Sequence, residues 1–409
     1  MKPAGLAGFC RRRLLPLVLL AGLCLALPAA GPPPAPATSG QDSYEALRLA
    51  SEAFYEIGQK YVQPKDEGEL MQGALRGMMN ALDPDSSYLT PEEYREFQRG
   101  GRGAPAEAGL ELIYKDHLLT AVSVLDHGPA ARAGLKSGDL ILKINGQLVR
   151  NLTTQEGMRR FQGPPGTVIR VQVVRNGLPK PLDLSITLEP LSPPKLTSQV
   201  LKGDYAYVRI PYFQDDTPAV LAGVLRDLKR QHPGLKGLIL DLRNNARGSL
   251  EQAVRTASLL VGNREVVSTR GRKGGESQVY RGKEQDLVFK TLPPTVVLVD
   301  QGTARGAEIV SGALQDHGLA TLLGDKTFGL CGITKAFPLK DGAAVIMTVA
   351  AAYTPKGRKI TGNGLVPDVE GKKPAPGEPA PAPPTLEQDP WVMQALDYLK
   401  RGAAPAKRS

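Results

Sequence analysis

The sequence predicts an α/β protein of several domains, and three observations lead to this prediction. The chain has 409 residues, a length that fits roughly two to three domains. In its second half, strand-like apolar runs alternate with helix-like segments, which is the order typical of an α/β core. Two segments rich in proline and alanine, 31–40 and 372–385, have the composition of linkers and separate the folded parts from the ends.

The first residues of the chain have the pattern of a secretory signal peptide. Three arginines at 11–13 precede the apolar run 14–27, and small residues follow at 29–31. We therefore expect residues 1–30 to direct export to the periplasm; the alternative is an uncleaved N-terminal segment that anchors the chain. After cleavage, Cys331 is the one cysteine left, so no internal disulfide can form.

Helical periodicity predicts an N-terminal helical region at 41–106. Apolar residues recur at helical spacing within 47–61 and again within 70–78. Thr90, three residues before Glu93, predicts a capping box at the start of a further helix.

The segment 107–190 is rich in strand and turn signals. Gly128 begins a short helix-like run, and a Gly-Asp turn at 138–139 leads into an alternating strand that ends at the Asn-Gly turn 145–146. A further strand-like run follows at 168–174. The segment resembles a PDZ domain, a module that binds a protein C-terminus as an added strand.

This resemblance places the loop that would hold a peptide carboxylate at Gly109, Leu110, Glu111 and Leu112. Gly109 would let the backbone turn toward the anion, and Leu110 and Leu112 would line the pocket for the last side chain of the peptide. The alternative is a PDZ-shaped regulatory lid that has no ligand of its own.

Residues 191–371 are predicted to form the α/β core. The strand-like runs are 206–211, 237–242, 295–300 and 319–323, and the helix-like segments are 219–229, 253–260 and 309–317. Asp241 and Arg243 are expected to form a structural ion pair at a strand end. Residues 386–409 are predicted to form a closing amphipathic helix and a basic tail.

Two further motifs of this core are Gly302-Thr-Ala-Arg-Gly-Ala-Glu308 and Thr327-Phe-Gly-Leu-Cys-Gly-Ile-Thr334. They resemble motifs of the carboxy-terminal processing peptidases, also called tail-specific proteases. The segment 302–308, Gly-Thr-Ala-Arg-Gly-Ala-Glu, matches the family's Gly-Ser-Ala-Ser-Ala-Ser-Glu, so Arg305 stands where the nucleophilic serine would be. The segment 327–334 matches Thr-Phe-Gly-Lys-Gly-Ser-Val-Gln, so Leu330 stands at the position of the lysine base and Thr334 at that of the glutamine that places the lysine. The resemblance extends over nearly the whole mature chain. It implies an α/β multidomain fold with a helical N-terminal region, a PDZ domain, a tail-specific-protease core and a C-terminal helix.

A third motif, on the oxyanion side of the family's site, also departs from the pattern. The segment 241–248 matches Asp-Leu-Arg-Asn-Asn-Pro-Gly-Gly with Arg247 in place of the first glycine, and a side chain there restricts close approach of the backbone to a substrate. A serine–lysine mechanism needs an amine that burial can keep neutral, and neither Arg305 nor Leu330 supplies one. The two arginines either form an electropositive groove that holds a carboxylate or face solvent, and both alternatives stay open.

We therefore predict a pseudoenzyme that binds protein C-termini as an adaptor, a decoy or a partner subunit. The competing prediction is an active serine-type endopeptidase with an unrecognised nucleophile. Thr303, Ser311 and Cys331 are the nearby nucleophile types, and Lys326 and Lys335 are the nearby amines. The structural alternative is that Ser311 lies on a helix face, Cys331 is a small hydrophobic residue of a loop, and both lysines are solvated.

Other function classes have little support in the sequence. The four histidines have no metal-ligand spacing, so neither a metal nor a cofactor is predicted. No basic stripe alternates with aromatic residues, which argues against nucleic acid as a partner. The net charge of +10 includes a basic C-terminal tail, so contact with a membrane is expected to be peripheral at most. The expected partners are protein C-termini, with a homodimer or a complex with an active homologue as further possibilities.

Overall fold

The computed structural model of the chain describes most residues from 40 to 402. The described ranges are 40–99, 105–115, 118–149, 152–192, 194–272, 275, 277–372 and 385–402. The predicted signal peptide, nearly all of both predicted linkers and most of the basic tail lie outside the described residues. The chain divides into two compact units, Met1–Lys65 and Asp66–Ser409, so the division falls inside the predicted helical region 41–106.

The first unit contributes one described helix, α1 (Gly40–Lys60). It agrees with the predicted helical spacing, and several of its large apolar side chains, such as Tyr44, Leu47 and Ile57, are exposed. Among the described residues, no helix combines the length and the apolarity that a bilayer span requires.

The second unit begins with a short N-terminal segment. It consists of α2 (Glu67–Asn80), β1 (Ser87–Leu89) and α3 (Pro91–Gln98). The predicted capping box is confirmed, because the Thr90 hydroxyl accepts the Glu93 N–H at 3.3 Å while Glu93 Oε2 accepts the Thr90 N–H at 2.7 Å. Strand β1 pairs antiparallel with β18 (Ala344–Tyr353), which is far along the chain.

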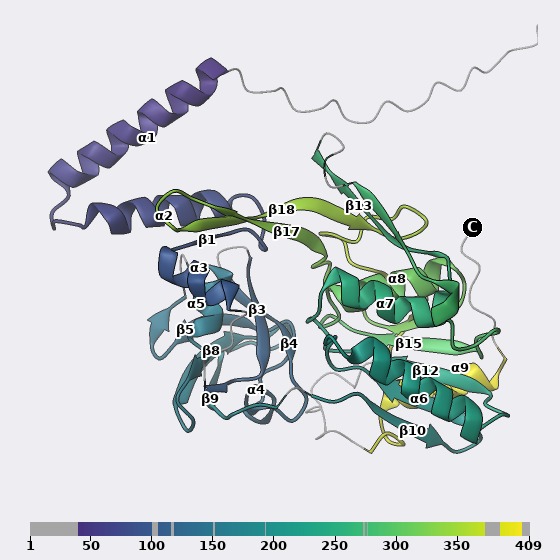
Figure 1. Ribbon diagram of the computed structural model, residues 1–409. Coiled ribbons are helices and arrows are strands. Elements are labelled where there is room, and N and C mark those ends of the chain that lie inside the picture. The colour runs from purple at the N-terminus through teal and green to yellow at the C-terminus, as the bar shows by residue number, and fades with distance from the viewer. Residues whose placement is uncertain are drawn as a thin grey trace, which may run out of the picture. The chain divides into compact units, whose positions relative to one another are not determined.

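The PDZ segment, from β2 to β9, is an antiparallel sheet with two short helices. Its elements are β2 (Ala106–Glu107), β3 (Leu110–Lys115), β4 (Leu118–Val124), α4 (Pro129–Arg132), β5 (Leu140–Ile144), β6 (Gln147–Leu148), α5 (Thr154–Arg159), β7 (Gln162–Gly163), β8 (Val168–Val174) and β9 (Leu182–Thr187). The main sheet has the order β3-β4-β5-β8-β9, and its inward side chains form one buried cluster. Strand β3 is an edge strand, and α5 lies beside it (Figure 1).

The α/β core is built on a second sheet of order β10-β11-β12-β15-β16-β19, parallel except for β10. Its strands are β10 (Thr197–Leu201), β11 (Tyr205–Arg209), β12 (Gly237–Asp241), β15 (Thr295–Val299), β16 (Thr321–Gly324) and β19 (Val369–Glu370), and its helices are α6 (Thr217–Gln231), α7 (Leu250–Val261), α8 (Gly306–Asp316) and α9 (Pro390–Lys400). Helices α6, α7 and α8 pack in one apolar cluster and α9 in another, so both faces of the sheet are covered (Figure 1). The α/β multidomain fold predicted from the sequence is confirmed.

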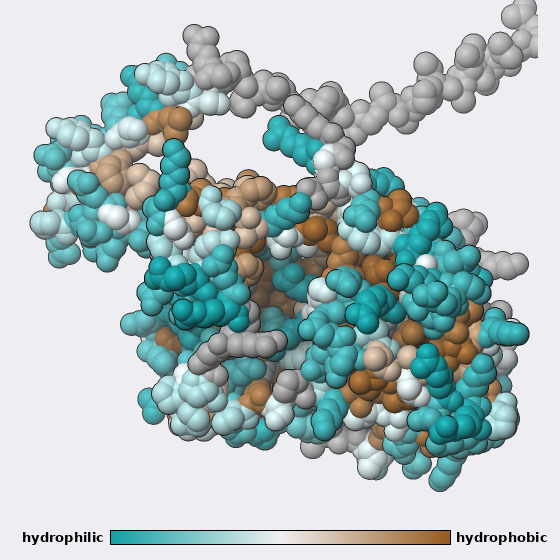
Figure 2. All heavy atoms as spheres, in the orientation of Figure 1, coloured by the Kyte–Doolittle hydropathy of each residue, from teal (hydrophilic) through white to brown (hydrophobic). Residues whose placement is uncertain are grey.

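A third sheet, which was not predicted from the sequence, has the order β1-β18-β13-β14 with β17 also paired to β18. Its remaining strands are β13 (Glu265–Gly271), β14 (Gln278–Arg281) and β17 (Gly332–Pro338). Figure 2 shows apolar side chains along the region of β17 and β18, where Phe337 and Leu339 are exposed. This sheet joins residues from the N-terminal segment to residues of the core.

Candidate functional site

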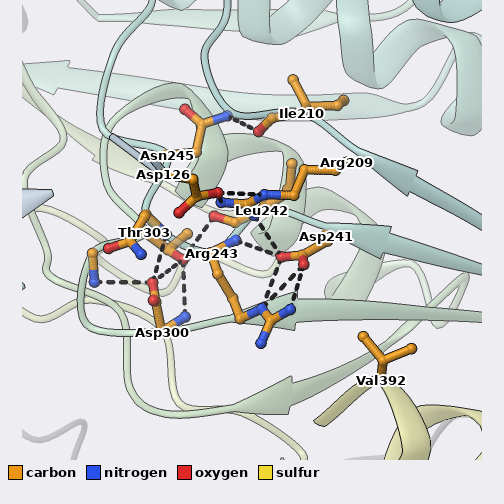
Figure 3. Close-up of polar contacts among 12 residues, drawn as sticks. Asp126, Arg209, Ile210, Asp241, Leu242, Arg243, Asn245, Asp300, Thr303 and Val392 are labelled. Carbon is orange, nitrogen blue, oxygen red and sulfur yellow. Dashed lines mark hydrogen bonds and ion pairs between the residues drawn. The ribbon is translucent and has the colours of Figure 1, made fainter. Parts of the chain in front are cut away.

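The predicted site motifs lie where the parallel strands of the core end. Strands β12 and β15 are neighbours and run in the same direction, so the loops that follow them meet at one edge of the sheet. Figure 3 shows the polar groups at this edge, with Asp241 as the last residue of β12 and Asp300 directly after β15.

Asp241 is the centre of a buried ion network that includes the predicted pair with Arg243. Its carboxylate accepts hydrogen bonds from Arg209 Nη1 at 2.9 Å, Arg243 Nη2 at 2.6 Å and the Tyr207 hydroxyl at 2.8 Å. Burial alone would raise the pKa of Asp241, but the two guanidinium groups outweigh it and hold this pKa well below its usual range. Arg209 also pairs with Asp126 of the PDZ segment, so the network joins two sheets (Figure 3). The predicted structural role of the Asp241–Arg243 pair is confirmed.

Asp300 builds the turn that follows β15. Its Oδ1 accepts the backbone N–H of Asn244 at 2.9 Å and that of Gly302 at 3.0 Å. The Thr303 hydroxyl donates to Leu242 O at 2.9 Å and accepts the N–H of Asp300 at 2.9 Å, and Thr303 is completely buried. Its hydroxyl is therefore used by the turn.

Arg305 occupies the strained turn between β15 and α8. It is the N-cap of α8, with φ 52° and ψ −120°, a backbone conformation that residues other than glycine rarely adopt. Its N–H donates to Leu330 O at 2.9 Å, and its Nη2 donates to Asp85 Oδ1 at 2.9 Å. The side chain of Arg305 is 33% exposed and that of Asp85 10% exposed, so this is a partly buried ion pair. A strained strand–turn–helix residue is the usual seat of a nucleophile, and here the residue is an arginine.

Leu330 lies beside this turn in an apolar environment. It forms a buried cluster with Ala246 and Ala304 of the core and with Ile113 and Val122 of the PDZ segment. The PDZ sheet therefore packs directly against the position that the sequence motif assigns to the base. Thr334, in contrast, is exposed in β17, where it pairs with Thr348 of β18.

Glu308 lies in the first helical turn of α8, three residues after Arg305, and is completely buried. Its Oε1 accepts the Gly329 N–H at 2.7 Å and the Thr327 hydroxyl, while its Oε2 has no partner among the described residues. Burial raises the pKa of Glu308 to about 7, although these hydrogen bonds lower it. The carboxyl group is therefore partly protonated near neutral pH.

The other nucleophile types near the site are held in structural roles. Cys331 is buried, its Sγ lies 3.6 Å from Arg305 O, and burial raises the pKa of its thiol well above the usual range. Ser311 is completely buried within α8. Lys326 and Lys335 are exposed, as predicted. Within the described ranges, no three His, Cys, Asp or Glu side chains are grouped as metal ligands.

Arg247 joins the core to the PDZ segment. Its Nε donates to Glu111, its Nη2 lies 3.8 Å from Glu107, and its guanidinium lies 4.9 Å from the centre of the Tyr212 ring. A cavity of about 210 Å³ opens beside it, lined by residues of both parts that include Leu125 and Phe213. Since Arg247 pairs with Glu111 and Glu107, and Arg305 with Asp85, the open alternative of an electropositive groove is wrong.

The predicted peptide-binding loop begins the edge strand β3. Gly109 has φ 71°, the left-handed conformation that glycine favours, and a Cβ there would lie 3.0 Å from Leu191. Leu110 lines a narrow space with Met158 and Phe161. Leu112 is buried in the core of the PDZ segment instead, and it is not among the residues that line this space.

Sequence reasoning missed the two acidic residues that complete the site in the core. Asp85 lies in the Asp-Pro-Asp run 83–85, between the second predicted helical segment and the predicted capping box. Its contact with Arg305 joins positions 220 residues apart, so no local pattern could have indicated it. Glu308 ends the motif 302–308, and a glutamate at the start of an apolar helix is a local signal that could have indicated it.

The fold and the site define a class of protein, an α/β peptidase-type core combined with a PDZ module. A family model described as peptidase family S41 matches residues 204–371, and one described as PDZ domain matches residues 120–175. The chain is 35% identical over 338 residues to the carboxy-terminal-processing protease of Bartonella bacilliformis, covering 82% of this chain and 77% of that protein. It is 31% identical over 339 residues to the carboxy-terminal processing protease CtpA of Bacillus subtilis, covering 83% and 71%.

A solved structure supports the same assignment. The photosystem II D1 C-terminal processing protease is similar with a TM-score of 0.67 and 26% identity, over 79% of this chain and 92% of that chain. The chain therefore belongs to the S41 family of carboxy-terminal processing proteases and carries a PDZ domain.

Proposed function

We propose that this chain is a catalytically inactive member of its family that binds protein C-termini through the PDZ domain without cleaving them. The observation that carries the proposal is Arg305, which stands at the strained turn where the family's motif has its nucleophile. A guanidinium group stays protonated in proteins, so it neither attacks a carbonyl nor accepts a proton from a hydroxyl. The bound protein would be presented, sequestered or passed to an active homologue.

The surroundings of the vacant base position support this proposal. Leu330 has no nitrogen, and its apolar contacts with Ile113 and Val122 fill the place where an amine would have to meet a hydroxyl. Thr334 faces solvent instead of supporting a base. Gly248 has a positive φ of 123°, but Arg247 before it adds a side chain that reaches the PDZ domain.

The alternative of an unrecognised nucleophile has little support from the geometry. The Thr303 hydroxyl is engaged on both sides by the turn, and the Cys331 thiol is buried and held protonated by the raised pKa. Ser311 is buried inside a helix. An activated nucleophile needs a base within hydrogen-bond reach and access to substrate, and these three groups lack the access.

Two features support the binding of protein C-termini. The PDZ family recognises an extended C-terminal peptide by adding it to an edge strand, and β3 is such an edge. Arg247 pairs with Glu107 and Glu111, which flank Gly109, so its single positive charge offsets part of the negative charge beside the expected carboxylate position. The N-terminal pattern of residues 1–30 leads us to propose export to the periplasm as the setting, with an uncleaved anchor as the alternative.

A cleavage assay tests the inactive state. The purified chain without residues 1–30 is incubated with an unstructured protein that has an apolar C-terminus, and the products are followed on a gel. The proposal expects an intact substrate. Cleavage that disappears in Thr303→Ala, Ser311→Ala or Cys331→Ala would establish the endopeptidase alternative instead.

A separate assay tests peptide binding. A fluorescent peptide that ends in valine with a free carboxylate should bind the chain, whereas the same peptide with a C-terminal amide should bind more weakly, because the loop at Gly109 would lose its anion. Equal affinity for the two peptides, or no affinity for either, would contradict the proposed recognition of C-termini.

A further inference from the structure

The edge of the PDZ domain that would receive a peptide is covered by the chain's own helix α5. The N–H of Leu112 donates to Met158 Sδ at 3.3 Å, and the N–H of Tyr114 donates to Thr154 Oγ1 at 2.9 Å. An added strand needs these outward N–H groups of β3 for its own carbonyl oxygens. The donors that a peptide would use are therefore already engaged.

The side-chain pocket at the same edge is closed as well. Leu110, Met158 and Phe161 line the space beside Gly109, which does not admit a water molecule. An apolar C-terminal side chain can enter only if α5 moves away from β3. The closure of the pocket and the engaged N–H groups thus have a common cause, which is the position of α5.

Ion pairs with the N-terminal segment hold α5 in this position. Arg159 of α5 pairs with Glu93 at 3.0 Å and with Glu96 at 2.9 Å, both in α3. Arg76 of α2 pairs with Glu156 of α5 at 3.1 Å. We call these five residues the α5 clamp. The clamp contains no residue that lines the groove, so its effect on peptide binding can be measured separately from direct contacts.

The clamp is connected to the site in the core through the loop 83–86. The Thr154 hydroxyl, which accepts the Tyr114 N–H, also donates to Pro84 O at 3.2 Å. The next residue, Asp85, pairs with Arg305 at 2.9 Å. A movement of α5 away from β3 therefore breaks a contact made by the same loop that closes the core site.

We propose that the α5 clamp keeps the peptide groove of the PDZ domain closed, and that a protein C-terminus binds by shifting α5 out of this clamped position. The inference rests on the proposed binding of C-termini and adds its regulation by the N-terminal helices. Partly exposed ion pairs contribute little individually, so the closed state is favoured by a modest factor that a ligand can overcome.

The experiment compares two variants in the full mature chain. The double variant Arg76→Met and Arg159→Met removes both cations of the clamp and replaces each with an unbranched apolar side chain. Arg160→Met is the matched control, because Arg160 is the C-cap of the same helix. Among the described residues, its guanidinium donates one hydrogen bond, to Gln147 on the surface. The probe is the fluorescent peptide that ends in valine with a free carboxylate. We expect the double variant to bind it about threefold to tenfold more tightly than the wild type, and the control to bind it unchanged.

Hydrogen exchange provides a readout that needs no ligand. The amides of Leu112 and Tyr114 should exchange about threefold to tenfold faster in the double variant than in the wild type, while amides of the central strand β8 keep their rates. If the double variant fails to fold, Arg159→Met alone serves for both measurements.

The outcomes separate this inference from the proposed function. If the wild type binds the peptide and the double variant binds it with equal affinity and equal exchange rates, the clamp is refuted and C-terminal recognition stands. If neither protein binds the peptide but the two amides exchange faster in the double variant, the clamp closes the groove and the proposed function is wrong. Unchanged exchange without binding refutes both.

Discussion

The core site and the PDZ groove are both closed by the chain's own side chains, but by contacts of very different strength. The core site is filled by Leu330, which packs against Ile113 and Val122, and by the partly buried pair of Arg305 with Asp85. The PDZ groove is closed by two hydrogen bonds from β3 to side chains of α5. Closure of the core site is therefore part of the packing between domains, whereas closure of the PDZ groove can be released.

The two closures differ because Leu330 lies in a buried apolar cluster, whereas the N–H groups of β3 lie at the edge of a sheet. Breaking an apolar contact in a buried cluster exposes area that costs free energy in proportion to its size. Releasing an edge-strand N–H costs little when water or a peptide can take its place. A ligand that supplies its own carbonyl oxygens therefore compensates for opening the PDZ groove, and no such compensation exists at Leu330.

The largest effect is expected from placing a lysine back at the core site. Leu330→Lys introduces an amine into the cluster of Ile113, Val122, Ala246 and Ala304, so it should reduce the free energy of unfolding by about 3–5 kcal/mol. Urea unfolding followed by the fluorescence of Trp391, the only tryptophan, measures this loss. Leu330→Met is the matched control and should cost less than about 1.5 kcal/mol. Similar small losses in both variants would mean that the PDZ domain leaves this position accessible.

A second prediction concerns the pH dependence of the core. Burial raises the pKa of Glu308 to about 7 from an ordinary value of 4.5, so the protonated form is the one that the folded state favours. The stabilisation from this proton is fully present below pH 4.5 and is lost as the pH rises through 7. Between these limits the wild type should lose on the order of 3 kcal/mol that Glu308→Gln does not lose.

The measurement is urea unfolding of both proteins at several pH values from 4.5 to 8. Glu251→Gln, at an exposed position in the first turn of α7, is the control and should follow the wild type. Parallel curves for the wild type and Glu308→Gln would show that the carboxyl group titrates normally.

The same contrast explains what could be predicted from the sequence. The strands β12 and β15 and the helix α8 were predicted because apolar periodicity and small-residue turns are local signals. The position of Arg305 in the turn between β15 and α8 was predicted because it follows directly from the order strand, turn, helix. The partner of Arg305 could not be predicted, since Asp85 lies 220 residues away in the chain, in the loop before β1, and β1 pairs with the distant strand β18. The closed state of the PDZ groove could not be predicted from the sequence either, because it depends on the spacing between α5 and β3.

A third prediction measures the ion pair at the core site. A double-mutant cycle with Asp85→Asn and Arg305→Met should give a coupling energy of about 1 kcal/mol, because both side chains are partly shielded from water. Arg230 and Asp227 in α6 form an exposed pair that provides the comparison, with an expected coupling of about 0.3 kcal/mol. Equal coupling in the two cycles would place Arg305 in solvent and weaken the account of a closed core site.

The smallest effect is expected at the PDZ edge. Thr154→Val keeps the shape of the side chain but removes the oxygen that accepts the Tyr114 N–H, and a single neutral hydrogen bond makes only a modest net contribution to stability. The free energy of unfolding should therefore fall by less than about 1 kcal/mol, and Thr187→Val on the exposed side of β9 should change it by less than about 0.5 kcal/mol. A loss comparable to that of Leu330→Lys would mean that the two closures are equally strong, and the groove would then be as permanently closed as the core site.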